Sequence, residues 1–334
     1  MRTELLSVDP ISPEPERIAR AAAVLHRGGL VAFPTETVYG LGANALDAAA
    51  IAGIFRAKGR PANNPLIVHV PEARDALPLV ADWPDTAERL AQRFWPGPLT
   101  LVLPKKVVVP DIVTAGGPTV AVRVPAHPVA LALLRAAGIP IAAPSANRST
   151  QLSPTRAEHV IRGLDGLIDL ILDGGPTTGG LESTVLDVTT SPPRLLRPGL
   201  VGQAEIEAVI GPIGHIGPIH TEDPLPSPGM MSRHYAPRKP LECIEGDATS
   251  RVWQLDAVGE RVGWVKFGFH IFPGSPNSFV IELPSNPIEG AAMLYEALHH
   301  LDHDLPVTRI VVELPPDTPE WLAVRDRLRR ASQG

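Results

Sequence analysis

Residues 28–58 read GGLVAFPTETVYGLGANALDAAAIAGIFRAK and predict a buried strand, a polar loop and a helix in that order. The apolar run Leu30–Phe33 has the length of a short strand, and Pro34 ends it because proline cannot donate to a strand ladder. Asp47 then opens a helical pattern. Loops between a strand end and a helix are where open α/β sheets bind ligands. The stretch therefore predicts a binding loop at the edge of an α/β sheet.

The loop carries three hydroxyls and a carboxylate within the five residues Thr35 to Tyr39, and Gly40 and Gly42 close it. Such polar groups are costly to bury without partners, so a binding function would explain them. A solvated surface loop explains the same composition, and this stretch alone does not separate the two.

Length and composition indicate a two-domain globular protein: 334 residues, 44% of them hydrophobic. The single cysteine, Cys243, excludes an internal disulfide framework and a cysteine-built zinc site, and we expect it in a core. The first residues have no apolar signal core and no run reaches transmembrane length, so the expected location is the cytoplasm without a membrane partner.

The net charge of −6 argues against a protein that coats nucleic acid. Residues 1–216 carry 19 Lys and Arg against 20 Asp and Glu, whereas residues 217–334 carry 11 against 16. Local basic clusters are therefore expected only in the first part of the chain.

Hydrophobic patterns outside the central stretch predict a mixed α/β domain, a linker and a small parallel-sheet domain. In the first domain, we expect strands at 66–70, 99–103, 119–124, 139–143, 167–173, 182–188 and 194–197, and helices at 14–28, 72–80, 85–95, 127–137, 154–164 and 203–210. Residues 211–239 are rich in Pro, Gly, Ser and His. In the last domain, we expect strands at 241–244, 261–265, 278–283 and 308–313, and helices at 288–300 and 319–330.

Several polar residues follow predicted strands or helices and are candidates for a site. Lys58 and Arg60 suit a polyphosphate, although cations at a solvated helix end look the same. Ser145 and Asn147 follow an apolar run, where a turn or cap is the alternative. Arg123 interrupts the apolar run 120–124 and suits a carboxylate ligand, unless it points to solvent from a strand.

Common nucleotide and hydrolase motifs are missing from the sequence. No GxxxxGK[ST], GxSxG or HExxH occurs, and the pair Gly40 and Gly42 lacks the third glycine of a dinucleotide fingerprint. His299, His300 and His303 have helical spacing, but we interpret them as a solvated helix end rather than a metal site.

Seven motifs occur in a fixed order, and together they resemble the YrdC-like threonylcarbamoyl-AMP synthases. They are PTETVYGLG (34–42), KGRPANNPLIVHV (58–70), WPGPLTLVL (95–103), VAVRVPAHP (120–128), APSANRS (143–149), ESTVLDV (182–188) and LLRPG (195–199). The later SPGMMSRHYAPRKP (227–240) resembles the linker of the longer, two-domain form. The resemblance implies a YrdC-like twisted mixed-sheet domain (1–210), a linker or lid (211–239) and a smaller Rossmann-like α/β domain (240–334).

The resemblance also implies a reaction. Such enzymes join L-threonine, bicarbonate and ATP, with Mg²⁺ on the triphosphate and no metal ligand from protein side chains, to give threonylcarbamoyl-adenylate and pyrophosphate. The product passes to tRNA threonylcarbamoyl transferase proteins, which modify the adenosine beside the anticodon.

Site residues are carried over by motif match. The catalytic set implied is Lys58, Arg60, Ser145 and Asn147. Threonine-contacting positions are Thr35, His69, Arg123, Ala143 and Ser183. ATP-contacting positions are Lys58, Ala62, Thr119, Ser145, Ser153, Arg197 and Tyr235.

Two other functions use a similar domain. One is a double-stranded RNA- or tRNA-binding module without ATP turnover, whose signature would be a continuous basic face and steep salt dependence. The other is a carbamoyltransferase of the hydrogenase-maturation type, which the single cysteine argues against. We also expect residues 230–237 to act as a lid.

Overall fold

The computed structural model describes residues 2–215, 234–268 and 277–333. It divides into two units, each treated by itself. The described part of the first unit is 2–149, 154–178 and 182–215, and the second comprises 234–268 and 277–333 with the short segments Thr150–Ser153 and Gly179–Leu181. Residues 216–233, which include most of the expected linker and half of the expected lid, lie outside the described residues. The domain boundaries and the lid therefore remain predictions.

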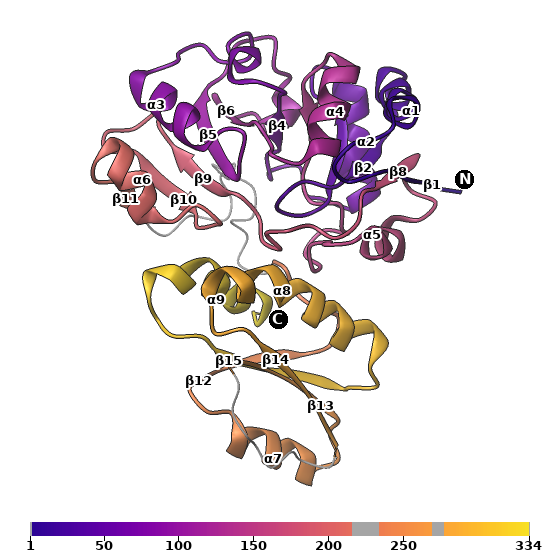
Figure 1. Ribbon diagram of the computed structural model, residues 1–334, viewed down its shortest axis with the longest axis vertical. Helices are drawn as coiled ribbons and strands as arrows, with labels where there is room; N and C mark the ends of the chain where they lie inside the picture. Colours follow the sequence, from indigo (N-terminus) through magenta and orange to yellow (C-terminus); the bar gives the residue numbers. More distant parts are fainter. Residues whose placement is uncertain (1, 216–233, 269–276, 334) are drawn as a thin grey trace. The chain divides into compact units, whose positions relative to one another are not determined.

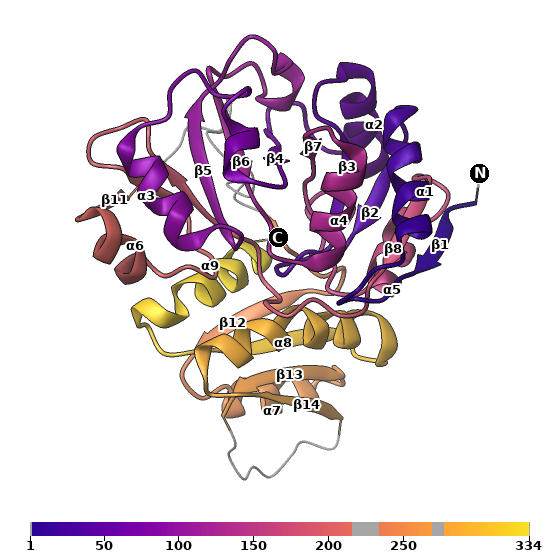
Figure 2. The ribbon, with the colours of Figure 1, turned by 45° about the horizontal axis from the view of Figure 1, so that its top comes forward.

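The first unit is built on one mixed sheet (Figures 1 and 2). In the described residues this sheet has 11 strands in the order β1-β8-β2-β3-β7-β4-β6-β5-β9-β10-β11. This confirms the expected mixed α/β class. The strands are β1 Glu4–Ser7, β2 Val31–Phe33, β3 Gly40–Asn44, β4 Ile67–His69, β5 Leu99–Pro104, β6 Thr119–Arg123, β7 Ile141–Ala142, β8 Leu170–Asp173, β9 Thr184–Asp187, β10 Arg194–Arg197 and β11 Gly214–His215.

Helices of the first unit follow the predicted pattern, with one exception. They are α1 Pro15–His26, α2 Ala48–Lys58, α3 Asp85–Phe94, α4 Pro128–Ala137, α5 Ala157–Leu164 and α6 Gln203–Ile210. The helix expected at 72–80 is wrong: only the 3₁₀ turn η1, Ala73–Ala76, forms there. Pro78 explains this, because proline has no N–H and its ring clashes with the preceding turn. A second 3₁₀ turn, η2, is Asp111–Val113.

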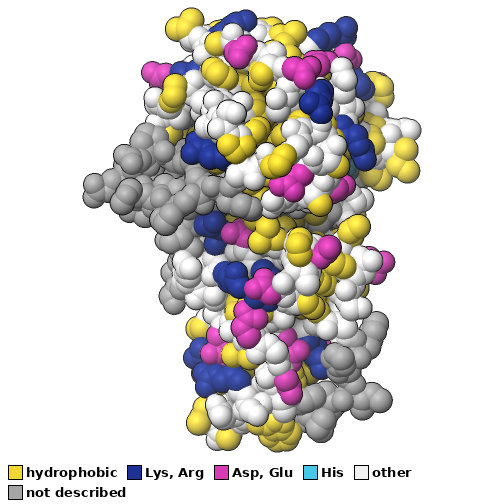
Figure 3. All heavy atoms as spheres, turned by 90° about the vertical axis from the view of Figure 1, so that its left-hand side faces the viewer, with side chains coloured by type: hydrophobic (Ala, Val, Ile, Leu, Met, Phe, Trp, Pro, Cys, Tyr) yellow, Lys and Arg dark blue, Asp and Glu magenta, His cyan; other side chains and the backbone are white. Residues whose placement is uncertain are grey.

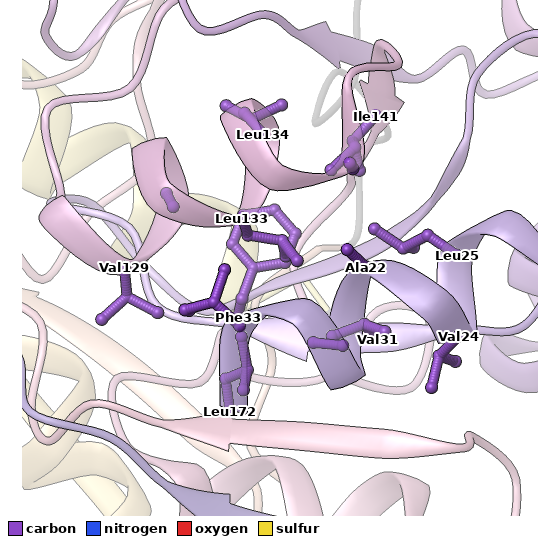
Figure 4. Packing of buried hydrophobic residues seen from close by; sticks show 14 of the residues in the cluster. Ala22, Val24, Leu25, Val31, Phe33, Val129, Leu133, Leu134, Ile141 and Leu172 are labelled. Atoms are coloured by element: carbon purple, nitrogen blue, oxygen red, sulfur yellow. The ribbon is translucent and has the colours of Figure 1, made fainter. Parts of the chain in front are cut away.

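The core of the first unit lies where α1 and α4 pack side by side over β2 and β8 (Figures 2 and 4). Phe33 on β2 is fully buried between Leu133 of α4 and Leu172 of β8. The apolar run that predicted β2 thus contributes the side chains against which α1 and α4 pack. It fixes the strand end from which the polar loop leaves.

The order strand, loop, helix predicted for residues 28–58 is wrong in one respect. Gly40 and Gly42 do not close the loop but lie in β3, which returns antiparallel to β2 and pairs Gly42 with Val31. A Cβ on Gly42 would lie 2.8 Å from both Ile141 Cγ2 and Phe33 Cε1. Glycine is needed because two side chains close over this strand. Asp47 then caps α2, accepting from the N–H groups of Ala49 and Ala50.

The second unit is a small parallel-sheet domain, as predicted. Its strands β12 Leu241–Glu245, β13 Val262–Phe267, β14 Ser278–Leu283 and β15 Arg309–Leu314 pair in the order β12-β15-β13-β14, all parallel. Helices α8 Pro287–His299 and α9 Leu322–Ala331 cover one face, and α7 Thr249–Ala257 the other (Figure 1). A π-helical turn, η3 His300–Asp304, and a 3₁₀ turn, η4 Pro319–Trp321, complete it. Sequence reasoning missed β1 and the short β11, which lies within the expected linker, and it expected helices between the strands of this domain without giving bounds for α7.

Cys243 lies half-buried on β12. Burial raises the pKa of its thiol to about 11, so the thiolate is scarce at neutral pH. This agrees with a packing role. In the described part of the chain, no helix combines the length and apolar character that crossing a membrane requires.

We expect Gly42→Ala to lower the free energy of unfolding by about 1–3 kcal/mol, because the added methyl overpacks the core against Ile141 and Phe33. Gly53→Ala in α2 is the matched control. There the nearest atom to an added Cβ is Leu30 Cδ2 at 3.4 Å, and alanine favours the helix by up to about 1 kcal/mol. Urea denaturation of both variants checks this, and equal effects would contradict the close packing over β3.

Candidate active site

Polar residues from three strands form a row across the first unit's sheet. The parallel pairing of β4 with β6 sets His69 beside Arg123. On the other side, β6 runs antiparallel to β5 with Leu101 opposite Val122, so the next step sets Arg123 opposite Thr100. Residues paired in this way point to the same face. Residues 69, 100 and 123 therefore meet on one surface.

Arg123 is nearly fully buried and holds the polar loop after β2. Its Nη1 and Nη2 each donate to Thr37 Oγ1 at 3.2 Å, and Nε donates to the carbonyl of Gly97 at 3.2 Å. Glu36 forms an ion pair with it, with Oε1 2.7 Å from Nη2. The loop predicted to bind a ligand is thus anchored on the arginine predicted to bind a carboxylate.

Thr35 lies in the same network. Its hydroxyl is 2.7 Å from that of Thr37 and donates to the carbonyl of Val38. Both threonines are buried. The hydroxyls of the PTET loop are therefore internal, which excludes the alternative of a solvated surface loop.

His69 is buried beside Arg123, and its Nδ1 has no hydrogen-bond partner. Burial lowers its pKa to about 3, and the charge of Arg123 adds to this effect. The imidazole is consequently neutral at physiological pH. A buried neutral ring with an unpaired nitrogen is suited to a hydrogen bond with a ligand.

Ser183 continues the row beyond Thr100. It immediately precedes β9, and its Oγ lies 2.8 Å from Thr100 Oγ1. Arg197, at the end of β10, donates from Nη2 to Ser183 Oγ at 3.1 Å and to the Ser183 carbonyl at 2.9 Å. The antiparallel pair β9–β10 thus brings the EST and RPG motifs together.

A second cluster gathers at the end of α2 and the tip of β7. Lys58 Nζ donates to the carbonyls of Ser145 at 2.6 Å and Asn147 at 2.5 Å, and to Asn147 Oδ1 at 3.2 Å. Ser145 Oγ donates to Asn147 Oδ1 at 2.6 Å. A bridge between Gly40 and Ser145 places this tip beside the start of β3. Three of the four predicted catalytic residues therefore meet.

Lys58 is only 2% exposed, and the partners of its ammonium in the described part of the chain are all neutral oxygens. Burial lowers its pKa well below the ordinary value, and the charge of Arg60 lowers it further. A buried cation with no counter-charge is unfavourable unless an anion joins it. This site is therefore suited to a phosphate.

Arg60, the fourth predicted catalytic residue, is buried and holds its own loop. Nη2 donates to Asn64 Oδ1 at 2.6 Å and to the carbonyl of Pro65 at 2.7 Å, and Nε donates to the Asn64 carbonyl. Its charge still acts on Lys58. The NNP segment of the motif is thus the scaffold of the basic loop.

The other predicted ligand positions differ in their surroundings. Ala62 is exposed, Thr119 is half-buried at the start of β6, and Ala143 is buried directly after β7. Ser153 and Tyr235 belong to the second unit, where both are buried. There the guanidinium of Arg327 lies 4.9 Å from the centre of the Tyr235 ring.

Comparison with known proteins gives matches along almost the whole chain. The model of the Sua5, YciO and YrdC family, described as telomere recombination, matches residues 23–199. A second, described as threonylcarbamoyl-AMP synthase, C-terminal domain, matches residues 201–333. The Bacillus subtilis threonylcarbamoyl-AMP synthase is 46% identical over 336 residues, or 98% of this chain and 96% of that protein.

The chain belongs to the Sua5/YrdC family.

Two further findings concern its relatives. The Pyrococcus abyssi threonylcarbamoyl-AMP synthase is 46% identical over 325 residues, 95% of this chain and 94% of that protein. The crystal structure of P. abyssi Sua5 complexed with L-threonine is 44% identical, with a TM-score of 0.92 over 99% of this chain and 98% of that one. The fold class and the family expected from the motifs are confirmed.

Reasoning from the sequence did not select Glu36, Thr37 and Thr100, which the structure places around Arg123. Glu36 and Thr37 stood in the central stretch, but their composition alone fits a solvated loop. Thr100 alternates within an apolar strand, and only the register with β6 places it beside Arg123. The available signal in the sequence was a threonine inside one apolar run, Leu99–Leu103, and an arginine inside the next, 120–124.

The interpretation of His299 as part of a solvated helix end is wrong. It is buried in the second unit, and its Nε2 donates to the Ser153 carbonyl at 3.0 Å. Among the residues that the structure describes, no three His, Cys, Asp or Glu side chains gather as they would around a metal ion.

We expect the low pKa of His69 to appear in the pH dependence of stability. The unfolded chain binds a proton near pH 6.5 but the folded protein does so only near pH 3, so stability is lost as the pH falls between these values. From pH 7 to pH 5 the loss is about 2 kcal/mol. His69→Gln should remove this slope in urea titrations, whereas the exposed control His26→Gln should follow the parent protein. A parent-like slope in His69→Gln would contradict the assignment.

Proposed function

We propose that this chain, as a threonylcarbamoyl-AMP synthase, uses its two polar clusters to hold ATP and L-threonine while bicarbonate joins them. The observation that carries this is Lys58, a buried ammonium at the end of α2 that is surrounded by neutral oxygens from the segment after β7, a strand of the sheet that also carries the row around Arg123. One cluster lacks an anion, and the other presents a guanidinium and several hydroxyls. A nucleoside triphosphate and an amino acid supply the matching groups.

Threonine would lie over the row of strand ends. The Arg123 guanidinium would donate to its carboxylate through the N–H of Nη1 that Thr37 does not take, and its charge would add to this bond. Ser183 and Thr35 offer hydroxyls, and the neutral His69 ring offers a nitrogen. Ala143 has no polar side-chain atom, so its part would be through the backbone.

ATP would lie at the Lys58 cluster. The ammonium has three donors, and all three now reach carbonyl or amide oxygens. A phosphate oxygen would replace the weakest of them, Asn147 Oδ1 at 3.2 Å. The remaining proposed ATP positions are Arg60, Ala62, Thr119, Ser145, Ser153, Arg197 and Tyr235.

The chemistry would be a displacement at phosphorus. The amine of threonine and CO₂ form a carbamate, a carbamate oxygen attacks the α-phosphorus of ATP, and pyrophosphate leaves. Lys58 and Arg60 would stabilise the charge that develops on the leaving group. Positioning carries the rest, and the reaction requires no covalent nucleophile from the protein.

Mg²⁺ fits this site as an ion carried by ATP. The groups around Lys58 are neutral oxygens rather than carboxylates, so phosphate oxygens and water would supply most of its ligands. When bound, it would neutralise part of the triphosphate charge.

Downstream, the product would pass to tRNA threonylcarbamoyl transferase proteins in the cytoplasm, with at most weak contact to tRNA. The rival RNA-binding function requires a continuous basic face. On the face shown in Figure 3, Lys and Arg side chains lie among Asp and Glu side chains. On this face the charges therefore do not form the continuous basic surface that the rival function requires.

The direct test of function is pyrophosphate release from ATP, with threonine, bicarbonate or ATP omitted in turn. We expect release only when all three are present. Release without threonine, or salt-sensitive RNA binding without any turnover, would overturn the proposal.

Variants at the two clusters should have different kinetic effects. Lys58→Met removes a charge from the phosphate site, so we expect kcat to fall by about 100-fold or more. Arg123→Lys keeps the charge opposite Glu36 but loses the planar set of N–H groups that holds Thr37 and leaves one for the ligand, so the KM for threonine should rise about tenfold or more with the KM for ATP within about threefold. The exposed Lys106→Met is the control and should behave as the parent. Similar small effects from both site variants would contradict the assigned roles.

A further inference from the structure

Glu36 is a buried carboxylate for which the proposed reaction has so far given no role. Its side chain is 14% exposed and that of Arg123 is 4% exposed, with 2.7 Å between Oε1 and Nη2. Apart from this ion pair, neither carboxylate oxygen has a hydrogen-bond partner in the described part of the chain. Buried polar atoms are nearly always hydrogen-bonded, so two oxygens with a single ionic contact between them call for an explanation. A ligand that brings N–H groups would supply one.

The donors of Arg123 limit how a carboxylate can bind. A guanidinium has five N–H groups. The carbonyl of Gly97 takes one, Thr37 Oγ1 takes two, and Glu36 lies against a fourth. One N–H of Nη1 remains for a ligand carboxylate, next to Glu36. An amino acid held there has its ammonium only one carbon from its carboxylate, so the ammonium falls within reach of the Glu36 oxygens.

An ammonium cannot capture CO₂, because its nitrogen has no lone pair. A free amino acid is still protonated at pH 7, since α-amino groups have pKa values of about 8 or above. We propose that Glu36 receives the ammonium of threonine and takes its proton, so that the free amine can form the carbamate. This inference rests on the proposed function of the site.

The proton balance closes without another reactant. Glu36 takes one proton from the ammonium. The amine nitrogen then forms a bond to the carbon of CO₂, while bicarbonate, the source of that CO₂, has lost hydroxide. The second proton lost as the carbamate forms neutralises that hydroxide to water, and Glu36 releases its proton to solvent.

The other titratable groups facing Glu36 are poorly suited to this step. Arg123 is always protonated. The Nδ1 of His127 accepts from the N–H of Val129 at 3.2 Å, so this nitrogen is occupied. Burial lowers the pKa of His127, although the charge of Glu36 acts in the opposite direction. Burial and the charge of Arg123 lower the pKa of His69 to about 3, because a protonated ring would place a second positive charge beside that guanidinium, whereas a protonated carboxyl adds none. Glu36 is therefore the base that this geometry favours.

The test compares Glu36→Gln, Glu36→Asp and the exposed control Glu16→Gln in the full-length protein. General-base catalysis typically contributes 10²–10⁴-fold, so we expect kcat/KM for threonine to fall by about 100-fold or more in Glu36→Gln. This variant depends on threonine that has already lost its proton. Its log kcat/KM should therefore rise by about one per pH unit between pH 7 and 8, more steeply than the parent. Glu36→Asp should recover part of the activity, and Glu16→Gln should match the parent.

The reverse reaction separates this role from a structural one. ATP formation from added threonylcarbamoyl-adenylate and pyrophosphate starts from a nitrogen that is already acylated, so Glu36→Gln should stay within about threefold of the parent. Lys58→Met should lose activity in both the forward and the reverse reaction. If Glu36→Gln lost both the forward and the reverse activity, the inference would be overturned. A pH dependence of kcat/KM parallel to that of the parent would overturn it as well. An inactive parent protein would instead overturn the proposed function.

Discussion

A single buried charge constrains this molecule more than any other feature. The Lys58 ammonium lies at the end of α2, out of water, and the described residues surround it with neutral oxygens. Keeping an unpaired charge in such a place costs several kcal/mol, which a fold tolerates only where function needs it. The tip after β7 carries the three oxygens and thereby positions Ser145 and Asn147. An anionic substrate would offset this cost. Part of the free energy of ATP binding would therefore come from pairing the buried Lys58 charge with a phosphate.

Sheet register supplies the other half of the site. His69, Arg123 and Thr100 come from residues spread over a long stretch of sequence, yet β4, β6 and β5 are neighbours, so the three meet on one face. Arg123 then anchors the loop after β2 through Thr37 and Glu36. Gly42 lets β3 pass close to the side chains of Phe33 and Ile141 as it pairs with β2, the strand from which the loop leaves. The binding loop, the guanidinium and the phosphate site thus depend on the same few strand pairings.

Much of this could be predicted from the sequence, for identifiable reasons. Apolar runs that end at a strand-breaking residue, such as Leu30–Phe33 before Pro34, predicted strands correctly. Asp47 marked the start of α2. Gly40 and Gly42 were misassigned to the loop because glycine marks both turns and close packing, and only the partner side chains tell them apart. Lys58, Ser145 and Asn147 were grouped by their motifs. Glu36 was missed because nothing in its local sequence shows that it is buried against Arg123.

The most direct test is whether ATP binding adds a proton to Lys58. Calorimetric titrations of Mg²⁺–ATP at a series of pH values, in buffers with different heats of ionisation, measure the protons taken up. Because burial holds the pKa of empty Lys58 far below its ordinary value and a phosphate would raise it again, we expect proton uptake in the parent protein. Lys58→Arg, which stays charged, should show none. The absence of uptake in the parent at every pH, or equal uptake in both proteins, would contradict the view that a phosphate binds at buried Lys58 and stabilises its charged form.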